Sequence, residues 1–317
     1  MRILIGCVNT AVSLIGYDTT LRQSFWYCPA NVIRACGVCY DEDALCIASD
    51  NSLTRISATH GVSSCHLPGP HDNYAHSVKH IGSGLLGVVD TGNSRVLLMP
   101  RDTDLTLTYE PLQGWQGDLP LDAIHLNDIL PVDDGVLASA FSYQPFTQWS
   151  TMAVEWKAAG LGVIYHLTRR GGKTLARIVA SGINCPHSLM EHNGDIYCCS
   201  SAQGDFIRFR WHASGVLHEV ERFHVTSTHF LRGALRTDDG WLLGGSSSRD
   251  AGIPCNMLLF HLADDGQVTE LPVARVGEIY DILPWNDAIM QPTTALLHSL
   301  PTLDVEGAFP PRCEPLA

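Results

Sequence analysis

Hydrophobic and polar positions alternate along this chain in short runs. Stretches of a few Val, Ile, Leu, Phe or Cys residues are bounded by Gly, Asp, Asn or Pro, and long helical patterns are scarce. Short apolar runs with turn residues at both ends are typical of β-strands joined by hairpins. The pattern therefore predicts a protein built almost entirely of β-strands.

One hairpin pattern recurs along the sequence. It consists of a polar start, a short alternating run, a tight turn and a second apolar run, and its clearest copy spans residues 75–90. Each copy opens on a residue that can carry chemistry. The copies begin at His76, His125, His187, His229 and Glu278.

Turn signals separate these runs, and successive hairpin tips lie about 40 to 60 residues apart, which is the length expected of a four-stranded repeat unit. A repeat of this size predicts an all-β, six-bladed β-propeller, with seven blades as the alternative. The predicted tips are Asp41-Glu42-Asp43, Gly82-Ser83-Gly84, Asp133-Asp134-Gly135, Asn193-Gly194, Asp238-Asp239-Gly240 and Trp285-Asn286-Asp287.

The last repeat needs strands from elsewhere. It begins at Glu278 but shows one hairpin before a proline-rich tail, and proline is poorly suited to strand interiors. The N-terminal runs RILIGCV, AVSLIGYD and QSFWYC supply the missing strands. Closing the last blade with the first strands would hide both sheet edges. We therefore expect a single propeller domain over residues 1–317.

An insertion at about residues 142–160 interrupts the third repeat. It is rich in Gln, Trp, Ser and Thr and contains Trp149 and Trp156. Long loops in compact domains are often functional, so this segment could form a lid over the site. A contact in a homo-oligomer is an equally good interpretation.

The composition of the chain limits the classes of binding partner and the cellular compartment that we expect for the protein. The formal net charge is -13 with 20 Lys and Arg residues, which argues against a nucleic-acid partner. No apolar run reaches the roughly 18 residues of a membrane span, and Asn9, Thr10 and Ser13 interrupt the N-terminal run, which is unlike a signal peptide. Eleven cysteines, an odd number, lie mostly in apolar runs, which favours a reducing cytoplasm.

Several short motifs carry a family resemblance: His-Leu-Asn at 125–127, Pro-His-Ser at 186–188, Arg-Gly at 232–233, Ser248-Arg249 and Glu-Ile-Tyr-Asp at 278–281. With them the chain resembles an uncharacterised family of bacterial propellers. That family lies within the six-bladed superfamily of gluconolactonase- and regucalcin-type lactonases, strictosidine-synthase-like proteins and NHL repeats. The resemblance covers five of the six repeats and implies the fold.

The lactonase branch of this superfamily places a divalent ion on Glu, Asn and Asp side chains in the central channel. This chain has His at most of the corresponding repeat starts. Lactonase chemistry is therefore not carried over to it, and the resemblance implies no particular reaction.

Equivalent positions of the repeats should converge, because the first strand of every blade lines the channel of a propeller. Counting back from the turn glycines aligns His76, Asn127, His187 and Arg232, and a period of two places His125, His229 and Glu278 one pleat further out. Imidazoles with a carboxylate suit Mn, Fe, Ni, Zn or Cu better than Ca or Mg. The predicted ligands of a divalent transition metal are His76, His125, His187, His229 and Glu278.

The remaining roles follow from this placement. Glu278 is a ligand or general base and Asp281 a second candidate base, while Arg232 could act in catalysis and pair with a substrate carboxylate or phosphate. Each assignment has a plainer alternative: a strand-start His can satisfy a loop, Asn127 can cap a turn, and Arg232 can join neighbouring blades. The predicted substrate-binding residues are Asn127, Arg232, Arg34 and Arg249.

These residues favour a metal-dependent hydrolase, lyase or isomerase acting on a small oxygen-rich or carboxylated molecule. Two alternatives stay open. One is a non-catalytic propeller that binds a ligand or a protein, and the other is a metal-free enzyme that uses His and Glu for acid–base catalysis.

Overall fold

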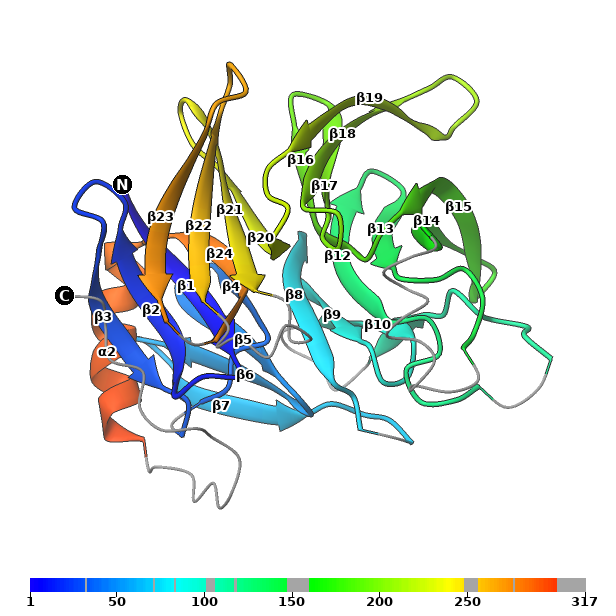
Figure 1. Cartoon of the computed structure of the whole chain (residues 1–317). Helices are drawn as coiled ribbons and strands as arrows, with labels where there is room; N and C mark the ends of the chain where they lie inside the picture. Colours follow the sequence, from blue (N-terminus) through cyan, green and yellow to red (C-terminus); the bar gives the residue numbers. More distant parts are fainter. Residues whose placement is uncertain are drawn as a thin grey trace. The chain divides into compact units, whose positions relative to one another are not determined.

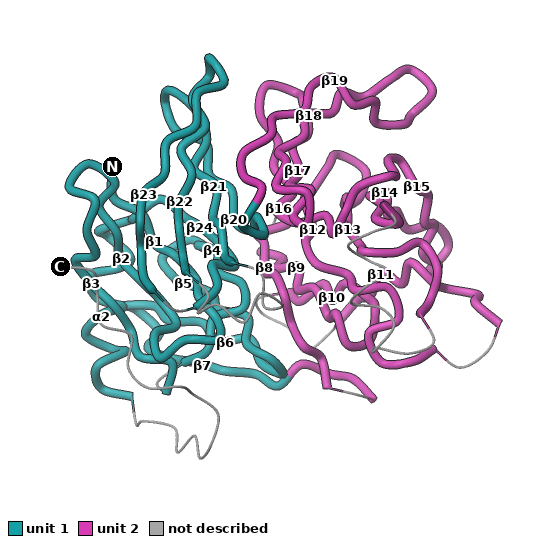
Figure 2. Tube along the Cα trace, viewed as in Figure 1, with its two compact units in different colours: residues 1–66, 228–317 teal, residues 67–227 magenta. Residues whose placement is uncertain are grey.

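A computed structural model describes residues 1–31, 33–70, 72–82, 84–100, 106–116, 119–146, 160–247, 256–275 and 277–300. The chain forms two compact units, shown in different colours in Figure 2. Unit 1 comprises Met1–His66 and Thr228–Ala317, and unit 2 comprises Leu67–Ser227. The expectation of one domain over the whole chain stays a prediction.

Unit 1 contains three antiparallel four-stranded sheets (Figure 1). In two of them the strands pair in chain order. The first is β4 (Gly37–Asp41), β5 (Ala44–Ser49), β6 (Ser52–Ser57) and β7 (Gly61–His66); the second is β20 (His229–Arg236), β21 (Gly240–Ser247), β22 (Met257–Ala263) and β23 (Val268–Ala274).

The third sheet of unit 1 joins the two ends of the chain. Its strand order is β24-β1-β2-β3, so β24 (Glu278–Pro284) pairs with β1 (Arg2–Val8), and β2 (Val12–Asp18) and β3 (Gln23–Pro29) complete the sheet. Antiparallel pairing of Ile5 with Ile282 shows the contact directly. The predicted closure of the last blade by N-terminal strands is confirmed.

Unit 2 also contains three antiparallel four-stranded sheets, each made of strands that follow one another in the chain. They are β8 (Ala75–Gly82), β9 (Leu85–Asp90), β10 (Arg95–Pro100) and β11 (Leu107–Tyr109); β12 (Leu126–Val132), β13 (Gly135–Ala140), β14 (Gly162–Arg170) and β15 (Lys173–Ile183); and β16 (Pro186–His192), β17 (Asp195–Ser200), β18 (Asp205–Trp211) and β19 (Leu217–His224).

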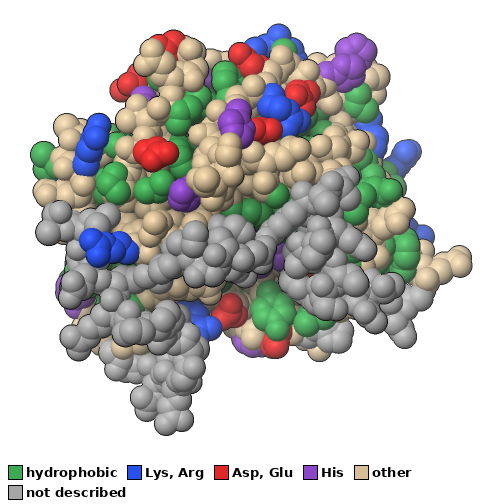
Figure 3. Space-filling model, in the orientation of Figure 1, with side chains coloured by type: hydrophobic (Ala, Val, Ile, Leu, Met, Phe, Trp, Pro, Cys, Tyr) green, Lys and Arg blue, Asp and Glu red, His purple; other side chains and the backbone are tan. Residues whose placement is uncertain are grey.

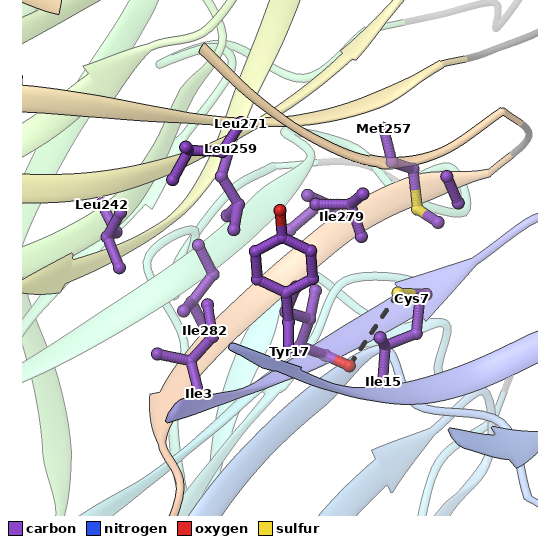
Figure 4. Packing of buried hydrophobic residues seen from close by; sticks show 13 residues of the cluster. Ile3, Cys7, Ile15, Tyr17, Leu242, Met257, Leu259, Leu271, Ile279 and Ile282 are labelled. Atoms are coloured by element: carbon purple, nitrogen blue, oxygen red, sulfur yellow. Dashed lines mark hydrogen bonds between the residues drawn. The ribbon is translucent and has the colours of Figure 1, made fainter. Parts of the chain in front are cut away.

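Six four-stranded antiparallel sheets, the last completed by the N-terminus, define a six-bladed β-propeller, as predicted. The cores lie between neighbouring blades. In unit 1 Tyr17 is almost fully buried among Ile3, Leu259 and Ile282 (Figure 4). Its hydroxyl donates to the Pro272 carbonyl at 2.9 Å. That bond satisfies the one polar atom that this ring brings into the core.

A second core of unit 1 includes a helix that the sequence pattern missed. The pattern predicts a hairpin tip at Trp285-Asn286-Asp287, but Asn286 is the N-cap of α2 (Asp287–Ser299), and its Oδ1 accepts from the Ala288 amide at 3.1 Å. Because β24 already pairs with β1, no hairpin partner is needed there. The helix buries Met290 and Leu297 against the strands of this core.

The face shown in Figure 3 carries no simple charge pattern among its described residues. Acidic and basic side chains are scattered among other residues over the face shown in Figure 3. Within the described part of the chain, no helix combines the length and apolar character needed to cross a membrane.

Candidate active site

Three first strands of unit 2 bring predicted site residues to equivalent places. β12 contacts both β8 and β16. His76, Asn127 and His187 are each the second residue of their strand. Counting back from the turn glycines thus aligned residues that occupy matching positions in three successive blades.

These three side chains make the same local contact. In each case a side-chain nitrogen bonds to the carbonyl oxygen two residues earlier, and the residue that bears this carbonyl has a positive φ, which is uncommon for residues other than glycine. The pairs are His76 Nδ1 with Tyr74 O at 2.7 Å, Asn127 Nδ2 with His125 O at 3.0 Å and His187 Nδ1 with Cys185 O at 3.0 Å.

This contact assigns the tautomers of two imidazoles. A carbonyl oxygen only accepts hydrogen bonds, so Nδ1 of His76 and of His187 must carry the hydrogen. Ser201 Oγ also lies 2.9 Å from Nδ1 of His187. In the neutral form of both rings, Nε2 is then the basic nitrogen.

His125 is oriented in the same way by a carboxylate. Its Nδ1 lies 2.6 Å from Oδ2 of Asp122, and both residues are buried and have positive φ. Burial raises the pKa of the Asp122 carboxyl, and the neighbouring His125 opposes that rise. A carboxylate on Nδ1 fixes the ring and stabilises the imidazolium that forms when Nε2 takes up a proton.

The rings pack into one group, which we call the imidazole cluster: His76, His125, Phe141 and His187. The ring centroids of His76 and His125 are 5.0 Å apart, nearly perpendicular to each other. Phe141 lies directly after β13 and contacts the rings of His125 and His187, with centroid distances of 4.4 Å and 5.1 Å. His76 is partly exposed, whereas His125 and His187 are buried.

Two acceptor atoms around His125 lack a hydrogen-bond partner among the described residues. They are Oδ1 of Asn127 and Oδ1 of Asp122, and both residues are at most 2% exposed. Buried polar atoms normally have a partner, so each of these oxygens is suited to a donor brought by a bound molecule.

Asp122 is the residue that sequence reasoning missed. It lies before the strand, outside the repeat positions that were compared, and a positive φ at both ends of the Asp122-x-x-His125 turn brings it to the ring. The spacing of three residues was the only signal for this pair in the sequence.

In unit 1 the predicted base Glu278 forms a buried ion pair with Arg232. Glu278 Oε2 accepts from Arg232 Nη1, and Oε1 accepts from Asn9 Nδ2 at 2.5 Å. The guanidinium carbon of Arg232 lies 4.5 Å from the ring centroids of both Phe230 and Tyr280. Both charged groups are thus held by neighbours in the same unit.

The other predicted residues of unit 1 make separate contacts. Asp281 Oδ2 accepts from the Val38 amide at 3.3 Å, and Arg34 pairs with Asp50 at 2.9 Å on the surface. His229 Nδ1 lies 2.9 Å from Thr228 Oγ1, and burial lowers the pKa of this imidazole. Arg249 and most of the insertion at 142–160 lie outside the described residues.

The predicted metal ligands are divided between the units: His76, His125 and His187 belong to unit 2, His229 and Glu278 to unit 1. Among the residues that the structure describes, no group of three or more His, Cys, Asp or Glu side chains could hold a metal ion. We therefore derive no chemical step through a metal. The metal site stays a prediction.

Comparisons with known proteins identify the fold. No protein-family model and no curated protein matches the chain. Among solved structures, a protein of unknown function from Bacteroides caccae is 12% identical with a TM-score of 0.58, covering 89% of this chain and 97% of its own. A Bacteroides fragilis protein provisionally described as a 6-phosphogluconolactonase is 14% identical with a TM-score of 0.51, covering 85% of this chain and 80% of its own.

A calcium-binding regucalcin from Agrobacterium tumefaciens is more distant, with 12% identity, a TM-score of 0.47 and coverage of 75% of each chain. The similarity to the two Bacteroides proteins, at 12% and 14% identity, shows the propeller fold and not an activity.

Proposed function

We propose that this protein is an enzyme that transforms a small, oxygen-rich molecule by acid–base catalysis at the imidazole cluster. The observation that carries the proposal is the 2.6 Å contact between His125 Nδ1 and the buried Asp122 carboxylate. An imidazole held in this way presents Nε2 as a base of fixed orientation. Such a base typically contributes about 10²–10⁴-fold to a rate.

The proposed mechanism assigns one role to each side chain. Nε2 of His125 removes a proton from a water molecule or from the substrate, and Asp122 stabilises the imidazolium through Nδ1. The imidazolium then returns the proton to the leaving or rearranging group. Hydrolysis, elimination and isomerisation can each proceed through such a proton transfer.

The unpartnered acceptors support a substrate rich in donors. Oδ1 of Asn127 and Oδ1 of Asp122 are buried on groups that already hold His125. Hydroxyl groups of a substrate could donate to both and so place its reacting atom near the ring. Asn127 thereby keeps the substrate-binding role that the sequence predicted.

Turnover of a panel of lactones, esters, hydroxy acids and sugar derivatives tests the proposal. We expect wild type to convert at least one compound class and His125→Gln to lose about 10²–10⁴-fold in kcat, the usual contribution of a general base. His212→Gln is the matched control, because His212 is exposed at the β18–β19 hairpin of the same unit. Equal rates for the wild type and His125→Gln would refute the proposal.

A metal-dependent form of the enzyme is the second candidate, and one observation favours it. A carboxylate bonded to the outer nitrogen of a His, as Asp122 is to His125, also accompanies metal-bound imidazoles in proteins. Metal content of untagged protein and rates with and without EDTA separate the two forms. Acid–base catalysis alone predicts a rate that survives the chelator.

A further inference from the structure

The first strand of the second blade in unit 2 contains a β-bulge beside the cluster. Leu126 pairs with Ala140 and Asp128 with Ser139, so Asn127 is an extra residue in β12. Asp128 follows this bulge, and its side chain is only 7% exposed. A buried carboxylate at this position must be satisfied by neighbouring groups.

Both oxygens of Asp128 accept hydrogen bonds from the neighbouring blades. Ser77 Oγ in β8 donates to Oδ1 at 2.6 Å, and the Leu189 amide in β16 donates to Oδ2 at 2.8 Å. Lys79 Nζ in β8 lies 3.9 Å from Oδ1 and offsets the charge. One carboxylate therefore connects three first strands.

The two donors lie next to cluster residues in the chain. Ser77 follows His76, and Leu189 lies two residues after His187. Leu189 also falls where the pairing of β16 with β17 shifts, between His187 and Met190. Asp128 supplies an acceptor to an amide in this irregular stretch, and hydrogen bonds to a charged group are stronger than those between neutral groups.

Unit 1 contains an equivalent residue far from the cluster in the sequence. Asp281 follows the bulge residue Tyr280, since Gly6 pairs with Asp281 and Cys7 with Ile279. It accepts from the Val38 amide of β4, the first strand of a neighbouring blade. Asp281 thus makes the same kind of link between two first strands within unit 1.

We infer that Asp128 is a positioning residue that holds His76 and His187 in place beside His125. Its importance to catalysis rests on the proposed function, because that proposal makes the cluster the active site. The placement of the imidazoles does not depend on the reaction and can be measured without a substrate.

The test compares Asp128→Ala, Asp128→Asn and Asp281→Ala. Each protein is treated at one fixed pH with diethyl pyrocarbonate, which modifies imidazoles, and the rates at His76, His125 and His187 are read by peptide mass spectrometry. We expect Asp128→Ala to change the rates at His76 and His187 severalfold. Asp128→Asn should restore them largely, because an amide oxygen can accept from Leu189 while the amide nitrogen donates to Ser77 Oγ.

Asp281→Ala is expected to lower the unfolding temperature without changing these three rates. Unchanged rates in Asp128→Ala, or an equal change in Asp281→Ala, would overturn the inference. If Asp128→Ala does not fold, Ser77→Ala serves instead: the rate at His76 must change while that at His187 does not, and any other result contradicts the role. Loss of the inference leaves the turnover test of His125 unaffected.

Discussion

Backbone conformation at single residues shapes the imidazole cluster. Asp122 and His125 have φ values of 55° and 49°, and Tyr74 and Cys185 in the neighbouring blades have 45° and 53°. Such conformations in residues other than glycine cost about 1–3 kcal/mol each and tend to persist at functional sites. Here they turn each chain so that the following ring nitrogen reaches a carbonyl or a carboxylate.

The substitution Asp122→Asn tests how much the buried carboxylate of Asp122 lowers the free energy of unfolding. Burial raises the folded-state pKa of Asp122 above its usual 3.8, so folding favours the protonated form. We therefore compare the free energy of unfolding of wild type with that of Asp122→Asn. The difference should favour wild type most below the pKa that Asp122 has in the unfolded chain, and it should fall as pH rises through the pKa of Asp122 in the folded protein. Thermal melts of both proteins from acid to neutral pH measure this difference, and an increase with pH would contradict it.

The same substitution should separate stability from catalysis. In Asp122→Asn the new amide oxygen would still accept from His125 Nδ1 but would carry no charge to stabilise the imidazolium. We expect a loss of about 10²–10⁴-fold in kcat with an unfolding temperature at neutral pH no lower than that of wild type. Parallel losses of activity and stability would instead indicate a structural role for Asp122.

The buried ion pair of Arg232 with Glu278 is expected to stabilise the folded protein. Their side chains are 11% and 3% exposed, so Glu278→Ala leaves a buried guanidinium without its charge partner. We expect a loss of about 3–5 kcal/mol in the free energy of unfolding, measured by urea denaturation. Arg34→Ala is the control, because its pair with Asp50 is exposed and should be worth about 1 kcal/mol at most.

At the scale of elements, the repeat pattern aligned residues near the start of the three first strands of unit 2, whereas Arg232, aligned by the same count, is the fourth residue of β20. His76, Asn127 and His187 were aligned by counting from turn glycines, and the structure places each second in its strand. The bulges escaped this reasoning, because an extra residue at Asn127 or Tyr280 leaves no signature in hydrophobic alternation. Because the bulges were not predicted, the hydrogen bonds by which Asp128 and Asp281 join neighbouring first strands were not predicted either.

Helix α2 was hidden for a related reason. Trp285-Asn286-Asp287 carries turn residues, and Asn and Asp serve equally well at a turn or at a helix N-cap. Asn286→Ala should cost about 1 kcal/mol in the free energy of unfolding, because the Ala288 amide loses its acceptor. Denaturant titration measures this loss, with Asn51→Ala in the β5–β6 turn as a comparison; no change at Asn286 would contradict the cap.

At the scale of the whole molecule, the sequence predicted the propeller better than the site. Six sheets and the closure by β1 follow from a pattern that repeats along the chain. The site depends on single loop residues such as Asp122, which no repeat marks. Phe141 shows the same limit, since its place between His125 and His187 arises from the pairing of β12 with β13.

The central claim is that the three imidazoles of the imidazole cluster are held through Nδ1 and so present Nε2 as the basic nitrogen. Long-range proton–nitrogen NMR of the His rings, assigned with single His→Gln variants at a pH where the rings are neutral, tests it directly. The contacts predict that His76, His125 and His187 carry their hydrogen on Nδ1. A hydrogen on Nε2 of His125 would contradict the account, because Nδ1 could then not donate to Asp122.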